Sequence, residues 1–250
     1  ANYGAVVAPR FGYLLSLPNF VEATALAPWW VGALAGGTTH YSSTRQELTL
    51  TRKDFQRGFL PNENRMSVIV SPKARTPLQI QRLKLVDFLS NHVSSLDIYG
   101  PEYRPLADKA EALRRSRYHL SVENSIHPGY WTEKLSDPIL LDNFVFYGGD
   151  QSVTSYFQSG SVSVINPFDL DGTYREVAEA LESDLWGQNA ESRKENRQKV
   201  LEELSFHRIL SHILTKREFV PSKGAHFSIP AQHPRRTIKS AFDPIYKLFR

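Results

Sequence analysis

The sequence predicts an α/β fold in which helices cover a doubly wound parallel sheet. Short apolar runs rich in β-branched and aromatic residues alternate with segments of helical spacing along residues 66–215. The runs are nearly continuous in apolar character, as in strands that are buried on both faces. The 250-residue chain shows no internal repeat and is long enough for a sizeable core. These observations predict a domain of the nucleotide-binding type.

The first strand and helix have clear boundary signals. The run "MSVIV" at 66–70 is followed by Ser71-Pro72, which ends a buried strand in a loop. The segment 77–91 begins with Pro, places leucines at helical spacing and ends in Asn, as helices do. The remaining expected elements are strands at 96–100, 118–124, 143–149 and 161–166 and helices at 105–117, 131–141, 172–186 and 190–215.

Charge and cysteine content narrow the possible partners and chemistry. The chain has no cysteine, which excludes disulfides, thiolate metal sites and cysteine nucleophiles. A net charge of +4 and a pI near 9.2 favour an anionic partner: nucleic acid, anionic lipid or a phosphorylated small molecule. The basic run 114–119 has too few aromatics in register for nucleic acid and is interpreted as a solvated helix face. The apolar stretch 21–35 contains Glu22, so no membrane span is expected there.

The stretch after the third expected strand combines groups suited to a ligand site. In doubly wound sheets, ligands bind beyond the carboxyl ends of the strands, where helix N-termini offer free N–H groups. Thr132 has the position of an N-cap, and Glu133 in the first turn suits the helix dipole. Lys134 opposes that dipole, which an anion beside it would offset. Two interpretations stay open: an anion site, or only a cap, a charge and a turn.

The longer segment "YHLSVENSIHPGYWTEKLSDPILLDNFVFYGG" resembles the donor-binding signature of the α-1,3-fucosyltransferases, glycosyltransferase family 10, which move fucose from GDP-fucose to an acceptor sugar. The resemblance extends over about residues 66–215. It implies a GT-B-like fold, with a Rossmann-type donor domain at 66–215 and a smaller amino-terminal α/β acceptor lobe at 1–65. The residues that carry the signature are Glu123-Asn124-Ser125, Tyr130-Trp131-Thr132-Glu133-Lys134, Asp137 and Gly149.

The resemblance implies roles for the donor-site residues. Lys134 and Arg82 would neutralise the diphosphate, and Arg75 is the rival of Arg82 for the second position. Glu133 would accept hydrogen bonds from the ribose hydroxyls, which suits an acceptor-only carboxylate. The further implied residues are Asn124 and Tyr130, which would line the donor pocket, and Glu123, which would hold the fucose or the loop.

No metal or cofactor is expected beyond GDP-fucose as the donor substrate. The resemblance implies that two cations stabilise the departing GDP electrostatically, in place of an essential metal. Asp169-Leu170-Asp171 has the spacing of a metal motif, but it falls where the family has a plain acidic loop. We therefore do not assign a metal to it.

The catalytic base is the point at which this chain departs from the family pattern. The acceptor lobe of the family supplies a carboxylate base for a single inverting displacement. Here "LLSLPNF" has Ser16 where a Glu is expected, and serine cannot act as that base unaided. Glu22 is the nearest carboxylate and our candidate, with His40 more distant. The alternatives are a missing amino-terminal piece or an inactive relative that binds a GDP-sugar.

Partners and location follow from the resemblance and the tail. The partners are a nucleotide-sugar donor and a glycan acceptor, with no nucleic acid. We expect a cytoplasmic enzyme of bacterial surface polysaccharide synthesis. Residues 216–250 form a carboxyl-terminal tail that docks back on the body, or contacts the inner membrane through basic and aromatic residues at 235–250.

Overall fold

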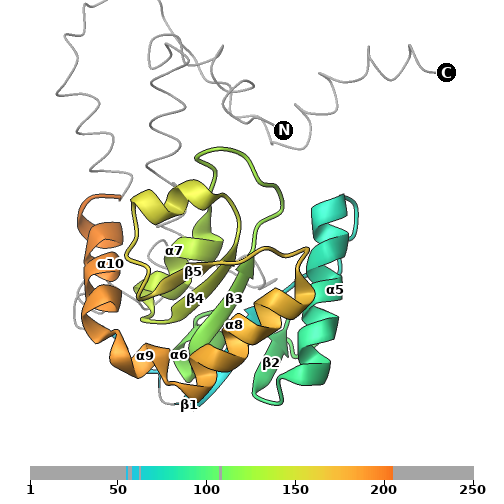
Figure 1. The fold of residues 1–250 in the computed structure, drawn as a ribbon, viewed down its shortest axis with the longest axis horizontal. Coiled ribbons are helices and arrows are strands. Elements are labelled where there is room, and N and C mark those ends of the chain that lie inside the picture. The colour runs from blue at the N-terminus through green and yellow to red at the C-terminus, as the bar shows by residue number, and fades with distance from the viewer. Residues whose placement is uncertain (1–54, 56–57, 62, 107–108, 205–250) are drawn as a thin grey trace, which may run out of the picture. The chain divides into compact units, whose positions relative to one another are not determined.

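The computed structural model describes residues 55, 58–61, 63–106 and 109–204. They form a parallel five-stranded sheet of order β2-β1-β3-β4-β5, so the predicted parallel α/β sheet is confirmed (Figure 1). The two predicted terminal regions, 1–65 and 216–250, lie almost entirely outside the described residues. The strands are β1 Glu63–Ile69, β2 Leu96–Tyr99, β3 Ser116–Val122, β4 Phe144–Gly148 and β5 Val162–Val164.

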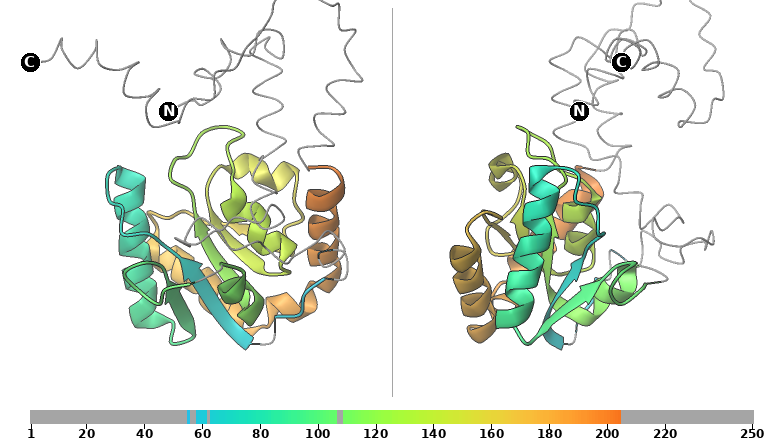
Figure 2. Two further views of the ribbon diagram at one scale, coloured as in Figure 1. Left: turned by 180° about the vertical axis from the view of Figure 1, so that it is seen from behind. Right: turned by 90° about the vertical axis from the view of Figure 1, so that its right-hand side faces the viewer.

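Helices cover both faces of the sheet (Figure 2). One apolar cluster joins the sheet to α5 and α8, and the other joins it to α6, α7 and α10. Within the described ranges, no helix has the length and apolar character needed to cross a membrane. The helices are α5 Pro77–His92, α6 Lys109–Arg115, α7 Glu133–Leu140, the 3-10 helix η3 Gln151–Ser155, α8 Leu170–Glu182, α9 Leu185–Gln188 and α10 Ala190–Glu202.

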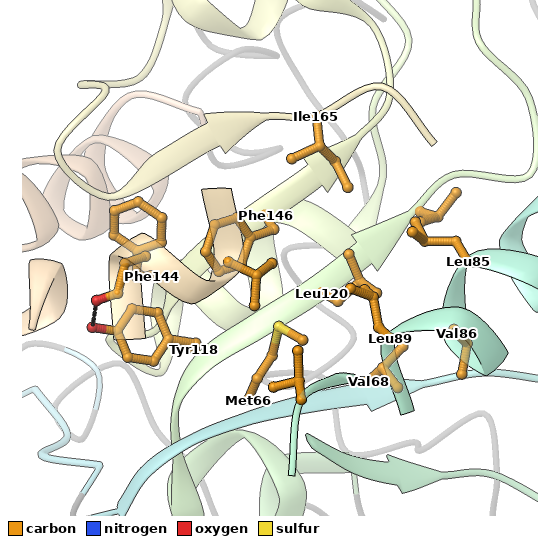
Figure 3. Close-up of a cluster of buried hydrophobic side chains, with 14 of the residues drawn as sticks. Met66, Val68, Leu85, Val86, Leu89, Tyr118, Leu120, Phe144, Phe146 and Ile165 are labelled. Atoms are coloured by element: carbon orange, nitrogen blue, oxygen red, sulfur yellow. Dashed lines mark hydrogen bonds between the residues drawn. The ribbon is translucent and has the colours of Figure 1, made fainter. Parts of the chain in front are cut away.

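The central strands of the sheet are buried and mainly apolar. Val68 of β1 pairs with Ile98 of β2 and with Leu120 of β3, which places β1 in the interior of the sheet. Figure 3 shows side chains of the α5 side of this core. There, the Tyr118 hydroxyl donates a hydrogen bond to the Ala180 carbonyl oxygen at 2.8 Å, which ties β3 to α8.

Several boundaries differ from the sequence prediction. Ser116 pairs with Glu63 of β1, so β3 begins inside the segment predicted as the helix 105–117. β1 itself begins at Glu63, so the expected domain boundary at residue 66 falls within a strand. The predicted helix 172–186 is interrupted because Asp184 adopts a left-handed conformation with φ of 50°. Its carboxylate then accepts a hydrogen bond from the Gly187 N–H and starts α9.

The starts of α5 and α7 are fixed by side-chain caps. Thr76 and Gln79 form a reciprocal capping box at α5, and Pro77 occupies the first turn. Thr132 is the N-cap of α7, as predicted, and its hydroxyl accepts a hydrogen bond from the Lys134 N–H at 3.3 Å. Both helices therefore begin at defined points beyond the carboxyl ends of β1 and β3.

Candidate functional site

A cavity of about 400 Å³ opens where the strand order reverses. The chain leaves β1 toward α5 on one face and leaves β3 toward α7 on the other, which creates a crevice at the carboxyl ends of these two strands. Crevices of this kind are the usual ligand sites of doubly wound sheets. The lining residues are Ile69, Ser71, Lys73, Arg82, Lys109, Leu113, His119, Leu120, Ser121, Val122, Asn124, Glu133, Lys134, Asp137 and Pro138.

Arg82 brings a buried guanidinium from α5 to the mouth of this cavity. The residue is only 5% exposed. Its Nη1 donates to Asn124 Oδ1 at 3.0 Å, and its Nη2 donates to the carbonyl oxygen of Ser71 at 3.2 Å. Arg82 thereby joins the loop after β1 to the loop after β3. The rival Arg75 is exposed and does not line the cavity.

Lys134 lies in the first turn of α7 between two carboxylates. Its Nζ is 3.5 Å from Glu123 Oε2 and 3.4 Å from Glu133 Oε1. Burial lowers the pKa of Lys134, but these carboxylates raise it by more, so the net pKa is raised and the ammonium stays charged. Glu123 and Glu133 therefore compensate the positive charge of Lys134 at the start of α7. The helix-dipole argument for an external anion is weaker than the sequence alone indicates.

Glu133 and Asn124 also line the cavity. Burial raises the pKa of Glu133, but the positive charges of Lys134 and Lys109 have the larger, opposite effect. The net pKa of Glu133 is therefore lowered. Glu133 is therefore an ionised hydrogen-bond acceptor facing the cavity. Asn124 accepts from Arg82 through its side-chain oxygen, which leaves its amide nitrogen as the group able to donate.

Glu123 does not line the cavity and serves the loop instead. It is fully buried, and its Oε1 accepts hydrogen bonds from the Thr132 N–H at 2.9 Å, the Thr132 hydroxyl at 2.8 Å and the Tyr147 hydroxyl at 3.3 Å. Burial raises its pKa, partly opposed by Lys134 and Thr132. Of the two roles that the resemblance implies, these contacts match the one of holding the loop.

Tyr130 is not brought to the cavity either. It is half-buried, and its ring packs edge-on against His127 with centroids 6.2 Å apart. Its carbonyl oxygen accepts a hydrogen bond from the Tyr147 hydroxyl at 3.5 Å. Tyr130 and Glu123 thus meet at Tyr147, on the side of the loop that faces β4.

The sequence assigned no role to three buried polar residues that line the cavity. Lys109 of α6 forms an ion pair with Asp137 of α7, and His119 of β3 lies beside them. Burial raises the pKa of Asp137 to about 7 against the opposing effect of Lys109. Burial, with Lys109, lowers the pKa of His119 to about 3, so the imidazole is neutral. Asp137 follows Glu133 by one helical turn, and this spacing is the signal that could have indicated a shared face.

Asp169 and Asp171, which have the spacing of a metal motif, lie at the start of α8. Asp169 is the N-cap of α8, and its carboxylate accepts from the Gly172 N–H at 2.9 Å. Among the described residues, no group of three His, Cys, Asp or Glu side chains is placed to hold a metal ion. Glu22, Ser16 and His40 lie outside the described residues.

The fold and the cavity together define a class of protein. A parallel α/β sheet whose switch point carries the buried Arg82, the half-buried Lys134 and an ionised acceptor has the architecture of the doubly wound nucleotide-binding domains. Residues 61–170 match glycosyltransferase family 10 (fucosyltransferase), C-terminal domain. The match covers the whole donor-binding signature, so the resemblance to that family is confirmed for this segment.

Curated relatives match over a short segment. The 4-galactosyl-N-acetylglucosaminide 3-alpha-L-fucosyltransferase FUT6 of Homo sapiens is 39% identical over 56 residues, which is 22% of this chain and 15% of the relative. The 3-galactosyl-N-acetylglucosaminide 4-alpha-L-fucosyltransferase FUT3 of Pan troglodytes is 38% identical over 60 residues, 23% of this chain and 16% of the relative. The matched segment spans about one sixth of these relatives.

Comparison with solved structures finds similarity to an alpha1,3-fucosyltransferase with GDP-fucose. It is 20% identical, with a TM-score of 0.46 over 66% of this chain and 49% of that chain. An alpha1,3-fucosyltransferase with GDP is 17% identical, with a TM-score of 0.42 over 79% of this chain and 62% of that chain.

Proposed function

We propose that the chain is the donor-binding part of an inverting glycosyltransferase that moves fucose from GDP-fucose to a glycan hydroxyl. The observation that carries this proposal is the convergence of Arg82, Glu133 and Lys134 on one cavity at the switch point. These residues lie within the segment that matches the fucosyltransferase family. The relatives named above are 3- and 4-alpha-L-fucosyltransferases, which supports fucose as the sugar.

The charges around the cavity suit the departure of a nucleoside diphosphate. When the bond between the anomeric carbon and the diphosphate oxygen breaks, negative charge accumulates on the leaving GDP. Arg82 and Lys134 are fixed in place before that charge develops, so they stabilise it with little reorganisation. Glu133 accepts hydrogen bonds from the ribose hydroxyls and fixes the nucleoside against α7.

The proposal also needs a base and an acceptor lobe, as in a GT-B-like enzyme. A carboxylate takes the proton of the acceptor hydroxyl as its oxygen attacks the anomeric carbon and GDP leaves from the opposite side. We assign this role to Glu22. Glu22→Gln should lower turnover by more than about tenfold while GDP affinity is retained, because a general base contributes about 10²-fold or more. A smaller loss in transfer assays would remove Glu22 and favour another base, such as His40.

Substitution of one cavity lysine tests the donor site directly. Lys134→Ala should weaken GDP binding by at least about tenfold in calorimetry, since it removes a charge-assisted contact to the diphosphate. The matched control is Lys194→Ala, which removes an exposed lysine paired with Glu191 on α10. Equal GDP affinities for the two variants would contradict the proposed site.

An inactive GDP-sugar-binding relative is the second candidate. Ser16 stands where the family pattern has the carboxylate, and this substitution favours the alternative. GDP binding combined with neither donor hydrolysis nor transfer to any glycan would support it. Turnover of GDP-fucose by the full chain would exclude it.

We further propose that the acceptor is a bacterial surface glycan built at the cytoplasmic side of the inner membrane. The basic and aromatic residues at 235–250 support contact with anionic lipid. Pelleting with anionic liposomes should fall when residues 235–250 are deleted. Unchanged pelleting would remove this part of the proposal.

A further inference from the structure

We infer that the inner part of the cavity binds the guanine base of the donor. Asp137 accepts hydrogen bonds from guanine N1–H and from the N2 amino group, and Lys109 donates a hydrogen bond to guanine O6. This inference rests on the proposed function and names the residues that would select the GDP donor. It assigns a binding role to a buried ion pair that the roles of Arg82, Glu133 and Lys134 leave unused.

The position of Asp137 relative to Glu133 supports contact with the base. Both residues lie on α7, four positions apart, and both line the cavity. This spacing is about 6 Å along the helix axis and keeps both carboxylates on one face. If Glu133 binds the ribose, a carboxylate one turn further along the helix lies where the far edge of the base would be.

Asp137 also has an oxygen atom without a hydrogen-bond partner among the described residues. Asp137 is only 1% exposed, and its Oδ2 pairs with Lys109. Its Oδ1 has no hydrogen-bond partner among the described residues. Buried polar atoms are normally paired, because an unpaired one loses the hydrogen bonds that water would supply. A ligand that donates two adjacent hydrogen bonds would complete this carboxylate.

The hydrogen-bond donors of the nucleobases distinguish guanine from the others at such a carboxylate. Guanine alone among the common bases presents a ring N–H next to an amino group, which together match the two oxygens of one carboxylate. Its neighbouring O6 is an acceptor, and Lys109 is a pure donor beside Asp137. Adenine, cytosine and uracil each offer the carboxylate only one donor position on that edge.

The walls around this pair suit a flat ring. Leu113 of α6 and Pro138 of α7 line the same cavity and supply apolar surface from two elements. His119 bonds to the Ser67 hydroxyl through Nδ1 at 2.9 Å, so that ring nitrogen is already engaged. The cavity volume of about 400 Å³ is in the usual range for small-molecule sites.

Xanthosine diphosphate provides a sharp test, because xanthine carries a carbonyl at C2 where guanine carries an amino group. Kd values for GDP and xanthosine diphosphate are measured with the full chain and with Asp137→Asn. The full chain should prefer GDP by at least tenfold. The variant should reverse that preference, since its amide can donate to the C2 carbonyl and still accept from N1–H. Glu133→Gln is the matched control and should weaken both ligands without changing their ratio.

Each result separates the base inference from the donor proposal. If the full chain binds GDP, ADP and UDP equally, the donor site stands and the base inference fails. If it binds none of them, the proposed function fails as well. An Asp137→Asn variant that keeps the original preference for GDP would show that the ion pair only joins α6 to α7. If that variant does not fold, the affinity of the unmodified chain for inosine diphosphate, which lacks the 2-amino group, is measured instead. An affinity equal to that for GDP overturns the role of Asp137.

Discussion

Lys134 has a structural role and a proposed binding role. It lies between a carboxylate that supports the loop, Glu123, and one that faces the cavity, Glu133. Glu123 lies beneath Lys134, fully buried and bonded to Thr132, while Glu133 faces the cavity. The ammonium offsets both negative charges, which explains why a lysine is tolerated in the first turn of α7. The two carboxylates have different surroundings because Glu123 follows β3 inside the fold, whereas Glu133 begins α7 at the cavity.

Glu123→Gln separates the two roles considered for Glu123. The substitution should lower the free energy of unfolding by about 1–3 kcal/mol, because the side chain is fully buried and its hydrogen bonds to Thr132 and Tyr147 would be disturbed. Urea unfolding without nucleotide measures this loss. Unchanged stability with a selective loss of affinity for GDP-fucose, but not for GDP, would place Glu123 against the fucose instead.

The pKa of Asp137 gives the base inference a pH dependence. Binding guanine through both carboxylate oxygens requires the ionised form, and burial raises the pKa of this carboxyl to about 7. Affinity for GDP-fucose should therefore increase by up to about tenfold from pH 6 to pH 8 and level off above. The facing groups keep their charge state: Lys134 has a raised pKa, Glu133 a lowered one, and His119 one of about 3.

Calorimetry of GDP-fucose binding across this pH range measures the effect. GDP-fucose is preferable to GDP because each of its phosphates is substituted at two oxygens, by one ester and the shared anhydride bond, and therefore does not titrate near pH 7. Asp137→Asn should abolish the dependence. An affinity that falls with increasing pH, or one that is flat in the unmodified chain, would contradict it.

At the scale of elements, α7 is fixed at both ends. Its start is capped by Thr132, and its end leads into Asp142, which has a left-handed φ of 69°. Asp142 Oδ1 is 2.9 Å from Arg197 Nη1 and 3.5 Å from Arg193 Nε, both on α10. The Arg193 guanidinium also stacks on Trp186 at 3.9 Å from the ring centroid. This buried ion pair holds α7, and with it the cavity residues, against α10.

Asp142→Asn tests the link between α7 and α10. Asparagine tolerates the left-handed conformation, so the change isolates the lost charge. It should destabilise the chain by about 3 kcal/mol, because two largely buried guanidinium groups lose their carboxylate partner. Glu191→Gln, which breaks an exposed pair on α10, should change stability by less than about 1 kcal/mol. Equal urea midpoints for the two variants would contradict this account.

At the scale of the whole molecule, the sequence predicted the sheet better than the site. Continuous apolar runs such as that around Val68 specify strands buried on both faces, and caps such as Thr132 specify helix starts. The break at Asp184 depends on one backbone conformation that no periodicity encodes. The Lys109–Asp137 pair was not predicted because its residues are 28 positions apart (109 to 137) and meet only when α6 and α7 cover the same face.

The residues that the family resemblance identifies lie at two different places in the structure. Arg82, Glu133 and Lys134 meet at the cavity, whereas Glu123 and Tyr130 lie on the other side of the loop. A sequence pattern identifies which residues a family shares, but it does not separate contact with a ligand from support of the loop.

Thermal unfolding of the chain with GDP, UDP, CMP and ADP compounds tests the central claim most directly. A ligand that binds the native state raises the unfolding temperature in a concentration-dependent manner. The account predicts that GDP and GDP-fucose raise it and that the other nucleotides at the same concentration leave it unchanged. No response to GDP, or a larger response to UDP, CMP or ADP, would contradict the assignment of this cavity as a GDP-fucose site.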